Sequence, residues 1–116
     1  MKTIRDLLIW QKAMNLVTNT YQITQKFPKE ELFGLTSQIR RSAISLPSNI
    51  AEGYGRDSNK EFLRFIKIVI GSLFEFQTQI EIAKNINYQN ENEFKNLYEE
   101  TRELEAMIIS FSKRLK

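Results

Sequence analysis

The chain is 116 residues long, enough for one domain with one hydrophobic core, and its 41% hydrophobic and 27% charged content is that of a globular protein. It has no cysteine and no histidine, which excludes disulfides and thiolate sites and removes the commonest general base. The net charge is +3, and residues 1–70 carry eleven Lys or Arg against six Asp or Glu. Most hydrolases, zinc proteins and redox enzymes are therefore disfavoured, whereas an acidic partner is permitted.

The first segment, residues 6–26, has the apolar spacing of a helix, with Leu7, Trp10, Met14, Val17 and Tyr21 three or four positions apart. Phe27 precedes Pro28, and a residue before proline is pushed out of helical geometry, so the helix should end there. Polar residues interrupt the short apolar run at the start, and no stretch is long enough to cross a membrane. We expect a cytoplasmic protein that does not associate with a membrane.

Three more segments have helical periodicity and predict helices over 35–54, 59–86 and 91–115. Ser58 before Glu61, and Asn90 before Glu93, have the spacing of N-terminal capping boxes. Gly53 and Gly55 fall where left-handed helix C-caps are common. Because the loops are short, sequential helices should be antiparallel neighbours. We predict one all-α domain over residues 1–116, an antiparallel up-down-up-down four-helix bundle.

Pro47 lies inside the second predicted helix. A proline there removes one hydrogen bond and clashes with the carbonyl group four residues back, at Ala43. The helix is therefore expected either to kink at Pro47 or to restart with Pro47 in its first turn. A kink could simply let the helix follow the core, or it could shape a binding surface.

The third predicted helix is apolar over an unusually wide arc. At 100° per residue, its apolar side chains span about 240°, more than one core-facing stripe requires. The helix is either the most enclosed of the four or in contact with another copy of the chain. We expect self-association, with the contact made by one flank of this helix, namely Leu63, Ile70 and Phe74.

Few residues suit catalysis. A di-metal carboxylate bundle requires histidines that the chain lacks, and no G-x-S-x-G nucleophile motif occurs. Glu52, Asp57 and Glu61 could in principle bind magnesium, but capping explains Glu61 and a turn explains Asp57. The sequence therefore predicts no catalytic residue, no metal site and no cofactor.

The strongest polar feature is basic and comprises Arg40, Arg41, Arg56, Lys60, Arg64 and Lys67. Lys60, Arg64 and Lys67 are four and three residues apart and should form a ridge opposite the core side of their helix. Such residues can pair with phosphates and release counterions, which favours nucleic-acid binding. The alternative is a solvated helix face whose arginines pair with nearby acids such as Glu52.

Five stretches of the chain carry a resemblance to a known family: residues 6–14 (DLLIWQKAM), 27–35 (FPKEELFGL), 38–43 (QIRRSA), 47–56 (PSNIAEGYGR) and 71–73 (GSL). Together they resemble the four-helix-bundle proteins encoded in intervening sequences of bacterial 23S rRNA genes. The stretch 47–56 is the most specific, and within it Asn49, Glu52, Gly53 and Arg56 match the family signature.

The resemblance implies a bundle that assembles as a homopentameric ring. It also implies similarity to the accessory variability protein of diversity-generating retroelements, a basic pentamer that binds nucleic acid and a reverse transcriptase. We therefore expect a non-enzymatic homo-oligomer that binds nucleic acid through the six basic residues. We expect this nucleic acid to be RNA, with a role related to rRNA or the ribosome. The alternative is a protein-interaction scaffold that has no intrinsic affinity for nucleic acid.

Overall fold

The computed structural model describes residues 3–116, which form four α-helices, two short 3-10 turns and no strand. The elements in chain order are η1 (Ile4–Asp6), α1 (Leu8–Thr24), η2 (Lys29–Glu31), α2 (Leu35–Tyr54), α3 (Asn59–Asn85) and α4 (Glu91–Leu115). The predicted all-α class and the three later helices are confirmed, with bounds that differ by at most one residue. The first helix starts two residues later than predicted, because η1 occupies residues 4–6.

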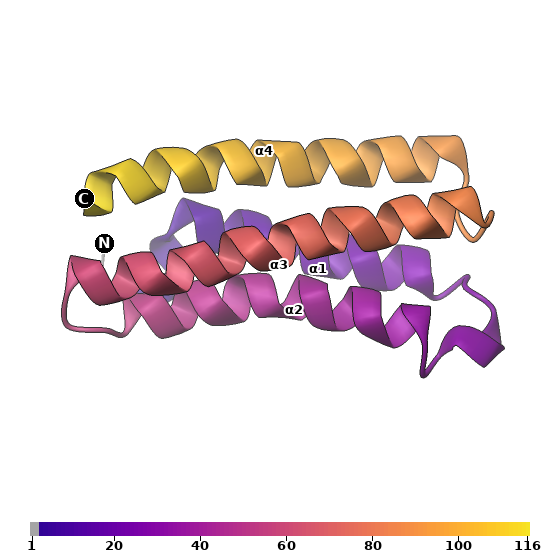
Figure 1. The fold of residues 1–116 in the computed structure, drawn as a ribbon, viewed down its shortest axis with the longest axis horizontal. Helices are drawn as coiled ribbons and strands as arrows, with labels where there is room; N and C mark the ends of the chain where they lie inside the picture. The colour runs from indigo at the N-terminus through magenta and orange to yellow at the C-terminus, as the bar shows by residue number, and fades with distance from the viewer. Residues whose placement is uncertain (1–2) are drawn as a thin grey trace.

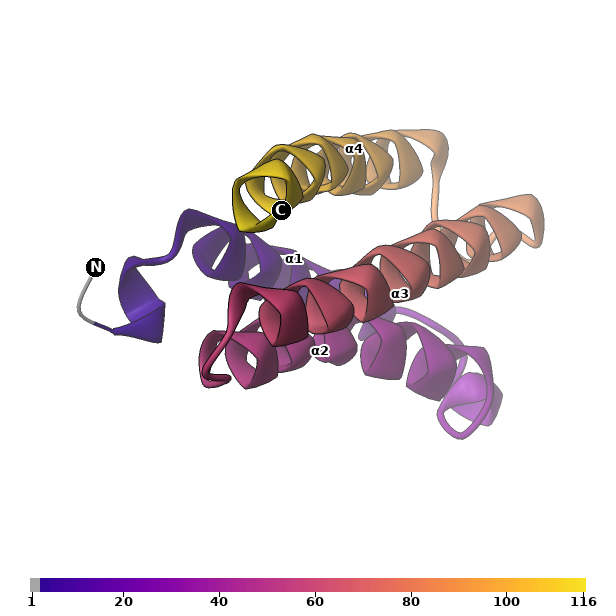
Figure 2. The same ribbon diagram turned by 60° about the vertical axis from the view of Figure 1, so that its left-hand side comes forward.

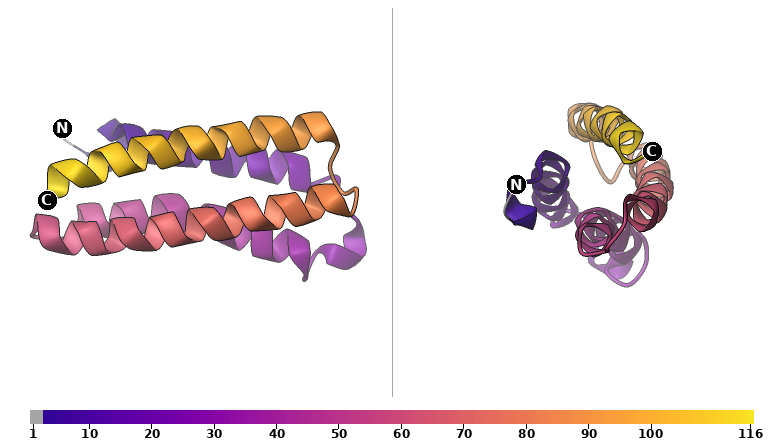
Figure 3. Two further views of the ribbon diagram at one scale, coloured as in Figure 1. Left: turned by 45° about the horizontal axis from the view of Figure 1, so that its top comes forward. Right: turned by 90° about the vertical axis from the view of Figure 1, so that its left-hand side faces the viewer.

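The four helices run alternately up and down and lie side by side in the order α1, α2, α3, α4, as the end-on view of Figure 3 shows. The closest packing joins α2 to α3, and α4 closes the bundle against α1. The molecule is elongated, 43 × 23 × 22 Å. The η1 turn, the C-terminus and the α2–α3 turn lie at one end of the bundle, and the α1–α2 and α3–α4 connections lie at the other (Figures 1 and 2).

Local hydrogen bonds fix the helix ends. Asn90 and Glu93 form the complete predicted capping box, whereas Ser58 supplies only its own half, accepting from the Glu61 backbone N–H. The left-handed residue after α3 is Asn87 (φ 66°), which closes a Schellman motif: its N–H donates to Lys84 O and the next N–H donates to Ala83 O. Asparagine tolerates this conformation, so it takes the place of glycine.

The left-handed glycine caps predicted at the end of α2 are wrong, because no glycine among the described residues has a positive φ; Gly55 is the C-cap residue but in a right-handed conformation. Gly53 is buried inside α2, where α3 approaches closely. A Cβ at this position would lie 2.7 Å from Cδ1 of Phe62 and 2.9 Å from Cβ of Phe65. Glycine is required here by the close approach of two helices rather than by a turn.

The core lies along the bundle axis, and in α2, α3 and α4 it is built from apolar side chains that recur three or four positions apart. In α1 the predicted stripe is not the most buried one: Met14 and Tyr21 are exposed. The buried face of α1 is offset and carries Ile9, Ala13, Leu16, Thr20 and Thr24. The two threonines are hidden because each hydroxyl donates to a carbonyl one turn earlier, which satisfies it inside the helix.

Pro47 is buried within α2, which is one helix from Leu35 to Tyr54. Of the two expectations for this proline, a restarted helix is therefore wrong. The proline lines a shallow apolar hollow of about 370 Å³ between α1 and α2, together with Trp10, Met14 and Ile44. Its place in the fold is thus at the contact between the first two helices.

Candidate nucleic-acid interface

The basic ridge predicted on the third helix is present. Lys60, Arg64 and Lys67 are all exposed on the first half of α3, on the side away from buried Ile66 and Val69. The Ser58 cap starts the helix just before Lys60 and so fixes where the ridge begins. Lys60 and Lys67 make no ion pair within residues 3–116, and both are therefore available to an external anion.

Arg64 of the ridge and Arg56 just before α3 both have acidic partners. Arg56 donates to Glu52 at 3.2 Å and lies over the Phe65 ring, 4.8 Å from its centroid. Arg64 donates to Glu61 at 3.1 Å. Both pairs are on the surface, where ion pairs contribute about 0–1 kcal/mol and exchange readily with other partners. The sequence left open a pairing of Glu52 with Arg40 or Arg41, but Glu52 pairs with Arg56.

Arg40 and Arg41 do not join the ridge. Arg40 turns toward α1, where its Nε donates to Thr24 Oγ1 at 2.9 Å and its guanidinium lies 4.4 Å from the Tyr21 ring centroid. Arg41 is exposed and lines a hollow between α2 and α3. It precedes the end of α2 by roughly 20 Å of helix. Arg40 and Arg41 thus lie apart from the other four predicted basic residues.

The C-terminus adds charge that the sequence reasoning did not assign. In the antiparallel arrangement the end of α4 lies beside the start of α3, and the Phe62 and Phe111 rings meet at 5.3 Å between centroids. Lys113, Arg114 and Lys116 are exposed at this end. The run K-R-L-K at the end of the sequence is the feature from which this additional charge could have been predicted. We call the combined set the basic end: Arg56, Lys60, Arg64, Lys67, Lys113, Arg114 and Lys116.

The opposite end of the bundle has acidic groups that stay ionised. The Leu35 N–H and the Tyr88 hydroxyl both donate to Glu31 and lower its pKa, and the same bond raises the pKa of Tyr88. The Asn90 N–H and the Lys26 ammonium lower the pKa of Glu93. This end is close to neutral, because residues 26–31 and 81–95 hold four Lys against five Glu. The net positive charge of the molecule therefore lies toward the basic end, which orients that end toward a polyanion.

The carboxylates considered for magnesium are separated by their ion pairs. Glu52 and Glu61 pair with different arginines, and residues 3–116 contain no group of three or more acidic, His or Cys side chains placed to hold a metal.

No helix in the described part of the chain is long and apolar enough to span a bilayer.

The residues predicted to contact another copy differ in exposure. Phe74 is 48% exposed, whereas Leu63 is only partly exposed and Ile70 packs against the core of its own chain. The same helix also exposes Ile68 and Ile82, and Ile86 directly after the helix is exposed too. Part of the wide apolar arc is thus explained by burial within the monomer, and part remains open to solvent.

The fold and the charge distribution define a class of protein, a small antiparallel helical bundle with one strongly basic end. Residues 5–110 match the family described as 23S rRNA-intervening sequence protein, and the chain belongs to that family. A similar fold occurs in a protein with unknown function from the S23 ribosomal protein family of Bacteroides thetaiotaomicron. That structure has a TM-score of 0.84 and 20% sequence identity, with 91% of this chain and 96% of the other covered. No curated protein matches the chain.

Proposed function

We propose that this protein is a non-enzymatic, homo-oligomeric RNA-binding bundle whose basic end contacts phosphates. The observation that carries the proposal is the convergence of the α3 ridge and the C-terminal cluster at one end, with Lys60 and Lys67 free of ion pairs among residues 3–116. Lysine and arginine contacts to phosphate supply affinity but carry little sequence information. Binding should therefore be strong at low salt and weakly selective.

RNA is the nucleic acid we favour because the family takes its name from intervening sequences of 23S rRNA. Two details of the basic end suit a polyanion of this kind. The Arg56 guanidinium lies over the Phe65 ring, 4.8 Å from its centroid, and a guanidinium can make bidentate contact with a phosphate. Its Glu52 partner is exposed, so a phosphate can replace that carboxylate at small cost.

Self-association would multiply the basic ends in one particle. Support comes from exposed apolar side chains on α3, where Phe74 and Ile68 are 48% and 50% exposed and would be covered by a neighbouring copy. A ring of five copies, as the sequence resemblance implies, requires two different surfaces of each copy to meet. Several basic ends bound to one RNA would raise the overall affinity well above that of one end.

The second candidate is a protein-interaction scaffold, and one feature favours it. An apolar hollow of about 590 Å³ lies between the start of α1 and the end of α4, lined by Leu8, Met107, Phe111 and other side chains. Leu8 is 66% exposed, and Arg114 borders the hollow. An acidic partner with apolar anchors would fit this surface, and RNA affinity would then be low.

Filter binding with purified structured RNA separates the two functions. Under the RNA-binding proposal, log Kd rises linearly with log salt, and several phosphate contacts give a steep slope. A scaffold instead retains little RNA even at low salt and requires a protein partner. Absence of RNA retention at low salt would therefore reject the first function.

A further inference from the structure

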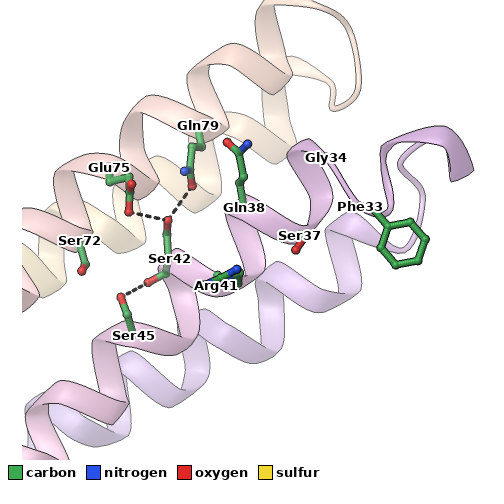
Figure 4. A pocket seen from close by; sticks show the side chains of 10 residues that line it. All are labelled: Phe33, Gly34, Ser37, Gln38, Arg41, Ser42, Ser45, Ser72, Glu75 and Gln79. Atoms are coloured by element: carbon green, nitrogen blue, oxygen red, sulfur yellow. Dashed lines mark hydrogen bonds between the residues drawn. The ribbon is translucent and has the colours of Figure 1, made fainter.

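A second polar site lies on the bundle away from the basic end. An open hollow of about 530 Å³ lies on the surface where α2 and α3 meet, and its volume is within the range of roughly 300–1,000 Å³ usual for ligand pockets. Short serine side chains from both helices keep it open, as Figure 4 shows. Its lining consists of Phe33, Gly34, Ser37, Gln38, Arg41, Ser42, Ser45, Ser72, Glu75 and Gln79.

Hydrogen-bonding groups in this hollow are only partly satisfied. The Ser42 hydroxyl is 3.0 Å from Glu75 Oε1 and 2.8 Å from Gln79 Oε1, so its single proton is shared between two acceptors, and each oxygen can accept a further hydrogen bond. The Gln79 side chain is only 8% exposed, and its amide nitrogen makes no hydrogen bond within residues 3–116. Arg41 has no ion pair there either. The hollow thus offers donors and acceptors to a polar ligand.

An aromatic ring stands at the mouth of the hollow. Phe33 is 94% exposed, on the turn just before α2, and its ring projects clear of the helices in Figure 4. A phenylalanine exposed to this extent leaves both ring faces free for a flat partner. Proteins that bind single-stranded nucleic acid use such rings as platforms on which bases stack.

We propose that the hollow binds an unpaired guanine of an RNA strand, an inference that rests on the RNA-binding function proposed above. The Glu75 carboxylate accepts hydrogen bonds from the guanine N1–H and 2-amino groups. Arg41 contacts the adjacent phosphate, and the neighbouring base stacks on Phe33. Unpaired bases are the part of RNA that proteins read on their Watson–Crick edges.

Guanine is the base that suits a carboxylate best. An ionised carboxylate only accepts hydrogen bonds, and guanine presents two adjacent donors on its Watson–Crick edge. Adenine and cytosine each place a ring-nitrogen acceptor beside their amino group, and uracil flanks one N–H with two carbonyl groups. These acceptors would face the negative charge of Glu75, so the other bases should be disfavoured.

The test uses fluorescence anisotropy with labelled single-stranded pentamers at low salt: UUGUU, UUAUU and a UUIUU probe in which inosine replaces guanosine. Inosine lacks only the 2-amino group, so we expect UUGUU to bind about tenfold more tightly than UUIUU. Glu75→Gln should abolish this difference in affinity and weaken UUGUU binding. Removal of a negative charge by itself would strengthen RNA binding, so weaker binding identifies the lost hydrogen bonds. Glu99→Gln, a matched change on exposed α4 surface, should leave the preference intact.

Two results would overturn the guanine site and leave the phosphate-binding function in place. One is equal binding of all three pentamers by a wild-type protein that binds structured RNA. The other is a changed particle mass in light scattering for Glu75→Gln or Arg41→Ala, which would assign the hollow to a contact between copies. Failure of the wild-type protein to bind any RNA would instead reject both proposals.

Discussion

Gly53 of α2 and Phe62 of α3 are in such close contact that the glycine has no room for a side chain. A Cβ at Gly53 would lie 2.7 Å from Cδ1 of Phe62, closer than van der Waals contact allows. Phe62 in turn meets the rings of Tyr54 and Phe111, so this one contact joins α2, α3 and α4 at the basic end. The position of the α3 ridge therefore depends on it.

Gly53→Ala should destabilise the protein by about 1–3 kcal/mol, because the added methyl group forces the Phe62 ring out of its packed position. Urea denaturation followed by circular dichroism measures the change. Alanine normally favours a helix over glycine, so the expected sign is opposite to that of helix propensity.

Gly71→Ala is the matched control. Gly71 lies in the middle of α3, and a Cβ there meets no atom of the described chain within 4 Å. Alanine at this position should stabilise the helix by about 0.5–1 kcal/mol. Equal effects of the two substitutions would contradict the close helix contact at Gly53.

Acid should weaken the end of the bundle opposite the basic end. The Leu35 N–H and the Tyr88 hydroxyl lower the pKa of Glu31 below its ordinary value of 4.5, so the ionised form stabilises the fold. This contribution is complete above pH 4.5 and is lost as pH falls through the lowered pKa. Tyr88→Phe removes one of the two donors and should reduce the loss of thermal stability on acidification.

The measurement for that variant is the melting temperature of both proteins between pH 7 and pH 3. Phenylalanine retains the ring that contacts Phe27, at 5.5 Å between centroids, so the hydroxyl bond alone is tested. Parallel pH profiles for wild type and variant would show that Glu31 is not coupled to Tyr88.

Phe74→Glu should dissociate the proposed assembly, since it places a charge on an apolar side chain that is 48% exposed. Light scattering of the wild type should give a multiple of 13.7 kDa, and the variant should approach the single-chain mass. Ile109→Glu on α4, where the side chain is 41% exposed, is the control and should leave the mass unchanged. A wild-type mass near 13.7 kDa would contradict self-association.

Periodicity was sufficient to predict helices wherever one face was uniformly apolar. It placed α2, α3 and α4, because their buried positions hold large aliphatic or aromatic side chains. It selected a stripe on α1 that is offset from the most buried face, where Thr20 and Thr24 are buried with their hydroxyls bonded to the backbone. Polar residues satisfied inside their own helix give no apolar signal.

Prediction of the site was less complete because it requires knowledge of which elements meet. The Lys60 to Lys67 ridge follows from spacing within one helix, and the structure has it. The addition of Lys113 and Arg114 depends on where α4 ends relative to α3, and the turn of Arg40 toward Tyr21 depends on packing between α1 and α2. Spacing within a single helix cannot reveal either relationship.

The RNA affinity of a double charge reversal at the basic end tests the central claim most directly. Lys60→Glu with Lys67→Glu is compared with Lys29→Glu and Lys95→Glu, which change the net charge equally at the opposite end of the bundle. We predict that the first pair weakens binding of structured RNA at least about tenfold and lowers the salt slope by about two. The control pair should have a much smaller effect. Equal losses of affinity in the two double variants would contradict a phosphate-binding surface at the basic end.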